Sequence, residues 1–508
     1  MENQNLSVIS AVWLLAVVWL VRRLLGGGSQ IAAPSNGSSV PEAAGGLPVL
    51  GHALEYKADA PRFLLDQCAR VGSVFRINLA GKRMVIVGAG REAIAATTNA
   101  AETVLSARDA VLAIGFREAL GDLNVREGTD FHKRVLKAWL PPAQLGEEVA
   151  RMHAAIVAAL HLELDFALGA QREARVRDLL TLVRRVVLRA MIGRMLGVAL
   201  LERAGAELID EVMRFQDALE DAIAKASVLP RALALPLALW PVQRRRRRLC
   251  ALVRTALDGA CDTDGRGPWL RAFETDGTPL ADRAELVVGL LFAAHKNPSI
   301  GGAQAFLHGV EHGGPELTAM RAEAARLCAE PTAAVLATCG ALRRCALETC
   351  RVTAHPIGAV RTIVAPAGFA LTDTRGRTHH ARAGETIALS HVAANLDART
   401  WGADARQYNP TRTEWAAASA MCDARSFASK GDVDEFKFTT FSQGLHKCPG
   451  EKLSLVVIQS VTAALLGGTD FELEPLLPLP PVSFERATLA QRAAPVPVRV
   501  ARRARALR

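Results

Sequence analysis

Aromatic residues are scarce in this chain of 508 residues, in which only 2 residues are Tyr and Phe, Trp and Tyr together make up 5%. So few rings give no obvious platform on which nucleic-acid bases could stack. Zinc-finger spacings and RNA-binding signatures are also absent. The formal charge of +10 would suit nucleic acid, an anionic membrane or an acidic protein equally well. Because the specific signatures are missing, we predict no nucleic-acid partner.

The sequence also lacks a disulfide framework. Its 9 cysteines are an odd number without regular spacing, which predicts mostly reduced, buried thiols in a reducing compartment. Disorder is excluded as well, because half of the residues are hydrophobic and only 22% are charged. The chain therefore has ample material for a buried core.

Long uncharged runs are rare, and the clearest one lies near the N-terminus, from Leu6 to Val21. It would span roughly 24 Å as a helix, somewhat less than the ~30 Å hydrocarbon core of a bilayer, unless the flanking residues extend it. Arg22 and Arg23 follow the run, whereas a cleaved signal peptide would carry its positive charge in front. We predict a retained transmembrane anchor over residues 1–25, with a cleaved signal peptide as the alternative. The arginines place the rest of the chain on the cytosolic side.

The remaining chain predicts a mainly helical, α+β protein. Residues 26–50 are rich in Gly, Ser and Pro and indicate a linker, so we expect the folded body to occupy residues 51–508. Strand-like runs begin at Ser73 and Arg83, with a hairpin turn at Gly81 and Lys82. Residues 90–350 have helical spacing without internal repeats, and strand-like stretches recur at 361–371, 385–390 and beyond 471.

An apolar, proline-containing stretch from Leu229 runs directly into five arginines, Arg244 to Arg248. Such a pairing could dip into a bilayer while the arginines contact phosphate headgroups. A solvated helix face beside a buried loop explains the same pattern equally well.

The most specific stretch is FTTFSQGLHKCPGEKLSL near the C-terminus. It places Cys448 in a glycine-bounded loop that leads into a helical segment after Pro449. The amides and positive dipole of a helix start should lower the pKa of the thiol and favour the anionic sulfur that a metal ligand needs. Gly444 and Gly450 permit turns and the close approach of a flat ligand. A buried cysteine in an ordinary loop is the alternative.

This loop closely resembles the haem-binding loop of the cytochrome P450 family. The fixed positions of the family pattern are matched by Phe441, Gly444, His446, Cys448 and Gly450. The resemblance implies that Cys448 is the axial ligand of the iron of haem b (iron protoporphyrin IX). It extends from Pro48 to about residue 470 and implies one helix-rich haem domain with small β-sheets, although length alone would suggest about three domains.

Two further segments carry the same resemblance. Glu348 and Arg351 stand one helical turn apart at the family's Glu-x-x-Arg spacing. The segment WGADARQYNPTR resembles the family's meander, which implies that Arg412 joins the two in a buried structural network. The resemblance also implies that Arg361 and His446 bind haem propionates. A usual Trp-x-x-x-Arg pair is absent near Phe131, and Lys137 or Lys133 is expected to substitute.

The segment from Glu285 to Phe306 matches the family's central helix but departs from it at the oxygen-activating position. Where typical monooxygenases have an acid and an alcohol that relay protons, this chain has Lys296 and Asn297, followed by Pro298. An amide donates and accepts hydrogen bonds but does not relay a proton as a hydroxyl does. Pro298 leaves the carbonyl of Ala294 without its helical donor, which could hold a water in a kink. We expect Asn297, Ala294 and Pro298 to form the catalytic segment, with His295 packed beside it.

Asn at this position resembles a branch that contains sterol hydroxylases and prostacyclin synthase. The resemblance implies a haem-thiolate monooxygenase that oxidises a hydrophobic sterol- or terpenoid-like molecule in the endoplasmic reticulum membrane. Electrons would come from an NADPH-dependent reductase docked on basic residues near the thiolate, namely Arg343, Arg344, Lys447 and Lys452. An isomerase or dehydratase of a lipid peroxide that needs no reductase is the alternative. A haem-binding carrier or sensor is a third, non-enzymatic one.

Overall fold

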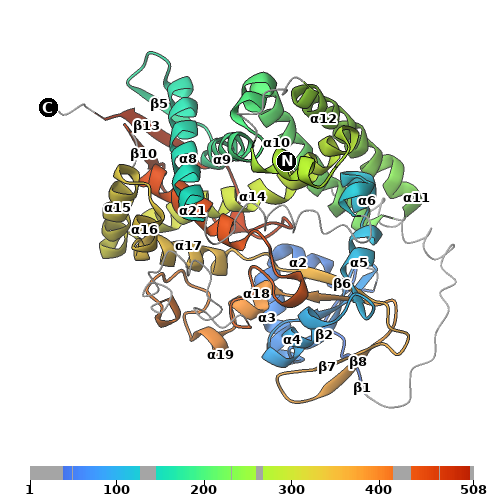
Figure 1. Cartoon of the computed structure of the whole chain (residues 1–508). Helices are drawn as coiled ribbons and strands as arrows, with labels where there is room; N and C mark the ends of the chain where they lie inside the picture. Colours follow the sequence, from blue (N-terminus) through green and yellow to red (C-terminus); the bar gives the residue numbers. More distant parts are fainter. Residues whose placement is uncertain are drawn as a thin grey trace, which may run out of the picture.

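The computed structural model describes residues 38–48, 50–125, 145–229, 231–258, 267–415, 436–467 and 470–503. Most of these residues are helical, and small sheets lie at the periphery of the helical body (Figure 1). The expected mainly helical α+β class is therefore confirmed. The predicted anchor over residues 1–25 lies outside the described residues. Within the described part of the chain, no helix combines the length and apolar character needed to cross a bilayer.

The helices fall into an N-terminal group, a central group and a C-terminal group. The first comprises α2 (Ala53–Ala58), α3 (Ala60–Arg70), α4 (Arg91–Asn99), α5 (Ala107–Ala113) and α6 (Phe116–Leu120). The second comprises α8 (Leu145–Leu168), α9 (Leu179–Met195), α10 (Val198–Val228), α11 (Arg231–Ala234), the π-helix η2 (Leu235–Leu239), α12 (Trp240–Asp258), α13 (Pro268–Thr275) and α14 (Leu280–His312). The third comprises α15 (Gly314–Ala329), α16 (Ala333–Ala337), α17 (Gly340–Val352), α18 (His391–Asn395), α19 (Ala398–Trp401) and α21 (Glu451–Leu466).

The largest sheet has five strands in the order β2-β3-β9-β6-β4. Its strands are β2 (Val74–Leu79), β3 (Lys82–Val87), β4 (Leu105–Ser106), β6 (Gly358–Ile363) and β9 (Thr386–Leu389). β2 and β3 form the predicted antiparallel hairpin, but its turn lies one residue earlier than predicted. Ala80 and Gly81 both have positive φ values, 52° and 89°, because Leu79 pairs directly with Lys82 and leaves these two residues as the turn.

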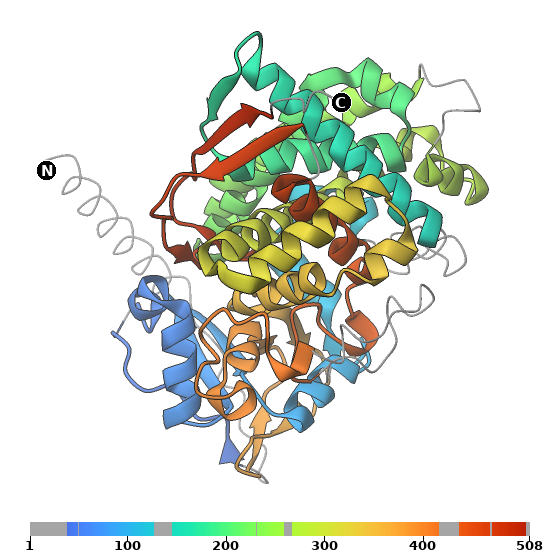
Figure 2. The ribbon, with the colours of Figure 1, turned by 90° about the vertical axis from the view of Figure 1, so that its left-hand side faces the viewer.

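Three smaller sheets complete the fold. Their strands are β1 (Ser38–Ser39), β5 (Glu173–Val176), β7 (Phe369–Thr372), β8 (Thr378–Ala381), β10 (Phe471–Pro475), β11 (Val482–Ser483), β12 (Gln491–Arg492) and β13 (Val498–Arg502). β10-β13-β5 lies beside α8, and β1-β8-β7 lies near the five-stranded sheet (Figure 1). In Figure 2 the blue segment that contains β2 and β3 lies alongside the orange segment that contains β6 to β9, in agreement with the parallel pairing of β3 and β9.

The folded body begins earlier than the predicted linker allowed. Ser38 and Ser39 pair with β8, Val40 and Ala43 are buried, and the amide of Ala44 donates to Gln67 Oε1 at 2.8 Å. The Gly- and Ser-rich composition indicated a linker, yet this segment satisfies its backbone groups on the sheet and on α3. Residues 38–48 therefore belong to the body.

The central helix α14 runs through the middle of the core for 33 residues and continues through Pro298. Two adjacent glycines let α21 approach it closely. A Cβ on Gly301 would lie 2.6 Å from Ile458 Cδ1, and one on Gly302 would lie 2.7 Å from Val461 Cγ1. Larger side chains there would push the two helices apart, so these glycines fix the distance between α14 and the helix that follows Cys448.

Candidate functional site

Backbone hydrogen bonds within the loop before α21 hold Cys448 in place. The amide of Cys448 donates to Phe441 O at 2.8 Å, and the amide of Lys447 donates to Gly444 O at 3.3 Å. Gly444 has a φ of 62°, and a Cβ there would lie 2.3 Å from Asn99 Oδ1 and 2.4 Å from Thr98 O on α4. Glycine is therefore required at 444 both by backbone conformation and by packing.

Gly450 is not required for the same reasons. Its φ is −93°, and a Cβ there would meet nothing closer than Cys448 Sγ and Ser454 Oγ, both at 3.9 Å. A side chain at 450 would therefore meet open space apart from these two contacts, and a glycine there leaves that space free for a flat ligand. Phe441 is partly buried and packs edge to face on Phe438, with ring centroids 6.0 Å apart. The side chain of His446 lies outside what the structure describes, as does Lys137.

The Cys448 side chain is exposed to solvent, although protein atoms crowd around its sulfur. Burial raises its pKa, which outweighs the hydrogen bond that the Gly450 amide donates to the sulfur. The nearby Glu451 carboxylate raises the pKa further, and Lys447 lowers it. The amide at the helix start thus lowers the thiol pKa as expected, but burial outweighs it and the pKa of the free thiol is raised. A bound metal ion deprotonates a thiol ligand by its own charge, so the raised pKa of the free thiol does not argue against metal binding by Cys448.

The other described cysteines differ from Cys448. All seven described cysteines are free, and five of them are buried, namely Cys68, Cys250, Cys339, Cys345 and Cys350. Most of the described cysteines are therefore buried thiols, as predicted. The same residues contain no cluster of three or more His, Cys, Asp or Glu side chains that could hold a metal ion. A haem iron needs only one protein ligand, so this absence leaves Cys448 as a candidate.

The structure brings Glu348, Arg351 and Arg412 together in a fully buried network. Arg351 donates to both oxygens of Glu348, Nη2 to Oε1 and Nε to Oε2, each at 2.7 Å. Arg412 Nε donates to Oε1 at 3.1 Å. Two further donors, which sequence reasoning missed, also reach the carboxylate: Trp415 Nε1 at 3.0 Å and the amide of Asn409 at 2.8 Å. The carboxylate is thereby saturated, as a buried charge must be.

A chain of hydrogen bonds joins this network to the cysteine loop. Arg351 Nη1 donates to Asn395 O at 2.7 Å, and Asn395 Nδ2 donates to Thr440 Oγ1 at 2.8 Å. The Thr440 hydroxyl donates to Cys350 O at 2.9 Å, and Phe441 next to it accepts the amide of Cys448. The network on α17 therefore positions the start of the loop that carries the thiol. Only tertiary contacts reveal the roles of Asn395 and Thr440, since neither occupies a fixed position of the family pattern.

Arg361 on β6 is a buried cation that makes no ion pair with any described residue. Its side chain is 6% exposed, and among the described residues its guanidinium donates a single hydrogen bond, to the carbonyl of the adjacent Val360 at 2.8 Å. Burial lowers its pKa, while the charge of Glu102 raises it. A buried guanidinium normally has a paired anion, so Arg361 fits a bound carboxylate such as a haem propionate.

On α14 the predicted catalytic segment divides into two faces. Ala293 and Asn297 are exposed one turn apart, and Ala294 is half-buried, although the flanking turns of this helix are in the core. Asn297 Oδ1 accepts the amide of Leu489, next to β12, at 3.1 Å. His295 and Pro298 are buried, and the Nδ1 of His295 lies 2.8 Å from Leu291 O. The face of α14 that carries Ala293 and Asn297 is therefore accessible, whereas the face that carries His295 and Pro298 is packed in the core.

Lys296 points away from that face. Its side chain is 2% exposed, and its Nζ donates to Asp217 Oδ1 at 2.8 Å and to Glu220 Oε2 at 2.6 Å on α10. Arg184 on α9 pairs with the other oxygen of Asp217 at 3.0 Å. Lys296, at the position where the resembled family usually has an acid, therefore takes part in an ion cluster between helices.

The basic residues expected near the thiolate are largely engaged within the protein. Arg344 donates to Glu316 at 2.7 Å, Lys447 pairs with its neighbour Glu451 at 2.8 Å, and Arg343 has partners as well. Lys452 makes no ion pair with any described residue. Cys448 does not line any of three of the protein's cavities that described residues form.

No protein-family model matches this chain, and no curated protein matches it significantly.

Proposed function

We propose that the chain has the cytochrome P450 fold and is a membrane-anchored haem-thiolate monooxygenase of hydrophobic small molecules. Two observations carry this proposal. Cys448 is an exposed thiol in a loop where a side chain at Gly450 would meet open space, and Arg361 is a buried guanidinium that makes no ion pair with any described residue. A haem would use both, the sulfur as an iron ligand and the guanidinium as a propionate partner.

Bound through Cys448, the haem supplies the redox chemistry that activates dioxygen. The chain's own residues hold and orient it. The Gly450 amide donates to the sulfur, and Glu348 with Arg351 and Arg412 fixes the segment on which the loop starts. Asn297 presents its amide on the accessible face of α14, where it can donate and accept hydrogen bonds near the substrate.

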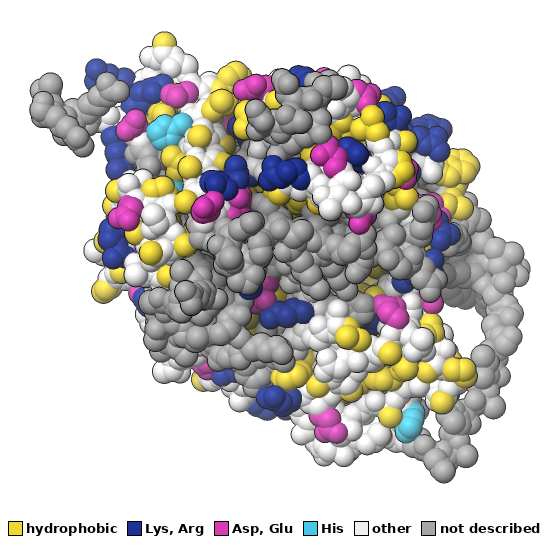
Figure 3. All heavy atoms as spheres, in the orientation of Figure 1, with side chains coloured by type: hydrophobic (Ala, Val, Ile, Leu, Met, Phe, Trp, Pro, Cys, Tyr) yellow, Lys and Arg dark blue, Asp and Glu magenta, His cyan; other side chains and the backbone are white. Residues whose placement is uncertain are grey.

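Membrane attachment is supported by the surface of α11 to α12 as well as by the predicted anchor. Leu237 is 64% exposed and Trp240 is 48% exposed. Of the five arginines that follow, Arg245 and Arg246 pair with Glu211 and Glu285, whereas the others are exposed. Figure 3 shows basic and hydrophobic side chains next to each other along the edge that carries α10 to α12 in Figure 1. The exposed apolar side chains and the three exposed arginines support the membrane-surface alternative, whereas Arg245 and Arg246 are engaged within the protein.

A lipid peroxide isomerase or dehydratase is the second candidate function. It is favoured by the surroundings of Asn297. Among the described residues its side chain has only the amide of Leu489 as a hydrogen-bond partner, and its neighbour Lys296 is held by Asp217 and Glu220. Turnover separates the two candidates. A monooxygenase needs NADPH and its reductase, and the oxygen incorporated into a sterol-like product comes from dioxygen. Turnover of a lipid hydroperoxide or endoperoxide without NADPH and reductase would favour the isomerase.

A further inference from the structure

A cavity of about 400 Å³ lies where the end of α10, α11 and η2 cover α5, α6 and the β2–β3 turn. Figure 1 shows α5 and α6 next to α11 on this side of the molecule. The volume is within the range of small-molecule sites. Most of the residues that line the cavity are apolar, among them Ala110, Ile114, Ala226, Leu229, Leu239 and Val360.

The segment that covers the cavity also forms part of the surface that we expect to contact a membrane. Leu237 and Trp240 are exposed, whereas Leu239 between them is buried and lines the cavity. The close approach of this segment to α6 depends on Gly115, because a Cβ there would lie 2.7 Å from Leu239 Cδ1. One side of the segment thus faces the proposed lipid contact, and the other side faces the cavity.

Lys82, the first residue of β3, adds a cation to this apolar wall. Its ammonium group makes no ion pair and no side-chain hydrogen bond with any described residue. Burial lowers the pKa of Lys82, so protein atoms rather than water surround much of the ammonium group. Such a charge is costly in an apolar environment, and an anion in contact with it offsets the cost.

Two other polar side chains line the cavity among the described residues, those of Glu118 and Thr386. Glu118 has an interaction partner of its own, and no carboxylate contributes to the pKa shift of Lys82. Thr386 is neutral and leaves the charge of the cavity unchanged. Lys82 is therefore the cation that remains available to a ligand.

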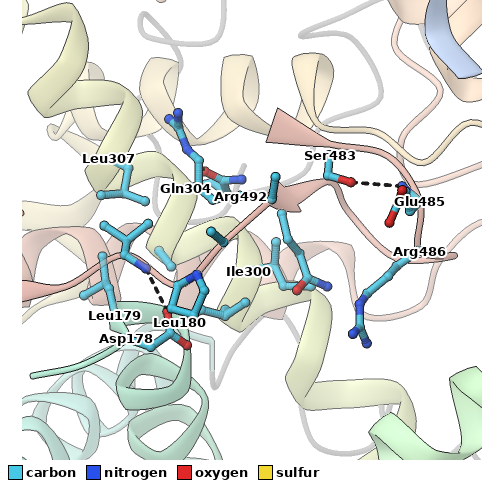
Figure 4. A pocket seen from close by; sticks show the side chains of 16 residues that line it. Asp178, Leu179, Leu180, Ile300, Gln304, Leu307, Ser483, Glu485, Arg486 and Arg492 are labelled. Carbon is cyan, nitrogen blue, oxygen red and sulfur yellow. Dashed lines mark hydrogen bonds between the residues drawn. The ribbon is translucent and has the colours of Figure 1, made fainter. Parts of the chain in front are cut away.

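A second cavity, of about 320 Å³ between α14 and the β11–β12 hairpin, differs in this respect (Figure 4). Two arginines line it, and both are paired within the protein. Arg492 Nη2 donates to Glu311 Oε2 at 3.0 Å, and Arg486 Nη1 lies 3.7 Å from Glu220 Oε2. Of these two cavities, only the one beside Lys82 thus offers a cation that no described carboxylate neutralises.

We propose that the cavity beside Lys82 binds a single-chain anionic lipid, such as a fatty acid, with the carboxylate on Lys82 Nζ and the chain against the apolar wall. The cation selects the anionic end, and the wall selects the hydrocarbon. Neither Cys448 nor Arg361 lines this cavity, so binding there does not require haem. Its place beneath the proposed membrane-contact surface gives a ligand dissolved in the bilayer a short route to the site.

Isothermal titration calorimetry of the full chain in phosphatidylcholine nanodiscs tests the site with two probes that share one chain, laurate and lauryl alcohol. Titration of empty discs gives the partition of each probe into lipid. Lys82→Met removes the charge and keeps an unbranched side chain. Lys225→Met is the matched control, because Lys225 is an exposed lysine on α10 that is not one of the described residues lining the cavity. Ala226→Trp fills the cavity.

We expect one equivalent of laurate to bind saturably to the wild type. It should bind about tenfold more weakly to Lys82→Met, the equivalent of one lost charge-assisted hydrogen bond, and normally to Lys225→Met. Ala226→Trp should abolish this equivalent, and Lys82→Met should not change the binding of lauryl alcohol. Because the discs hold phospholipid phosphate in large excess, saturable binding of laurate also distinguishes the free acid from a lipid headgroup as the ligand.

Absence of saturable laurate binding to the wild type, or equal binding to wild type and Lys82→Met, overturns the site. An equal loss of affinity for acid and alcohol in Lys82→Met also overturns it, because the charge would then have no part in recognition. A colourless protein that still binds laurate through Lys82 would refute the haem proposal alone.

Discussion

Lys296 Nζ lies 2.6 Å from Glu220 Oε2, and this contact joins the central helix α14 to α10 in the interior of the protein. Asp217 lies on the other side of the same ammonium group, at 2.8 Å. The cluster explains how a lysine is tolerated in a helix whose neighbouring turns are buried, because its charge is paired twice.

Replacing Lys296 should therefore destabilise the fold. Lys296→Met leaves Glu220, whose side chain is 12% exposed, with only a 3.7 Å contact to Arg486, and we expect a loss of about 3 kcal/mol in the free energy of unfolding. Urea unfolding followed by circular dichroism measures it. Lys225→Met, at an exposed position on α10, is the control and should change stability by less than about 0.5 kcal/mol. Equal effects of the two variants would contradict the structural role of Lys296.

Glu348→Ala should abolish haem loading. It leaves Arg351 and Arg412 buried without their carboxylate, and the hydrogen-bond chain through Asn395 and Thr440 passes this disturbance to the cysteine loop. The measurement is haem content per protein after expression with ample haem precursor. Glu330→Ala, at an exposed position at the end of α15, should load normally. Normal haem content in soluble Glu348→Ala would remove the proposed role.

Stability should fall as the solution becomes mildly acidic. Burial lowers the pKa of His153 and of His355 to about 4 and that of His295 to about 3. Each is neutral in the folded protein, whereas the unfolded chain takes up protons near pH 6.5. The stabilisation is therefore present above pH 6.5 and is lost as the pH falls toward 4, by about 1.4 kcal/mol per residue at pH 5.5.

His153→Leu tests the sign of this dependence. The difference in free energy of unfolding between pH 7.5 and 5.5 (about one unit above and below the ordinary histidine pKa) should shrink by about 1.4 kcal/mol relative to wild type. His312→Leu, which removes an exposed histidine, should leave the difference unchanged. A variant at 153 with the same pH dependence as wild type would refute the assignment.

The surface over α11 and α12 should become protected on lipid vesicles. In the full chain, hydrogen exchange of residues 233–248 should slow on vesicles of phosphatidylcholine and phosphatidylserine, because Leu237 and Trp240 insert while exposed arginines contact headgroups. The double variant Leu237→Asp, Trp240→Asp should lose this protection. Leu162→Asp, at a 51% exposed position on α8, should keep it. Equal exchange with and without vesicles in the wild type would exclude this contact.

Local patterns predicted the features that depend on neighbours in sequence. The strand-like runs from Ser73 and Arg83 predicted the β2–β3 hairpin, and its turn lies one residue earlier than predicted. Residues 38–48 were misassigned because Gly and Ser are typical of linkers, while their pairing with β8 depends on a strand 340 residues later. Composition carries no information about such a partner.

Within the candidate site, the resemblance placed Glu348, Arg351 and Arg412 correctly as one network, but it did not indicate Trp415 or the amide of Asn409. Which donors reach the buried Glu348 carboxylate depends on the tertiary fold, which the local sequence does not show. The thiol pKa shows the same limit, since the sequence indicates a helix start but not how deeply the sulfur is buried. Likewise, only the fold shows that Arg361 makes no ion pair with any described residue.

The absorption spectrum of the reduced protein under carbon monoxide tests the central claim most directly. The account predicts the red-shifted Soret band of thiolate-ligated haem in wild type and its loss in Cys448→Ser, in which an alcohol replaces the thiol. A protein that stays colourless with ample haem precursor, or a Cys448→Ser variant with an unchanged spectrum, would contradict the account.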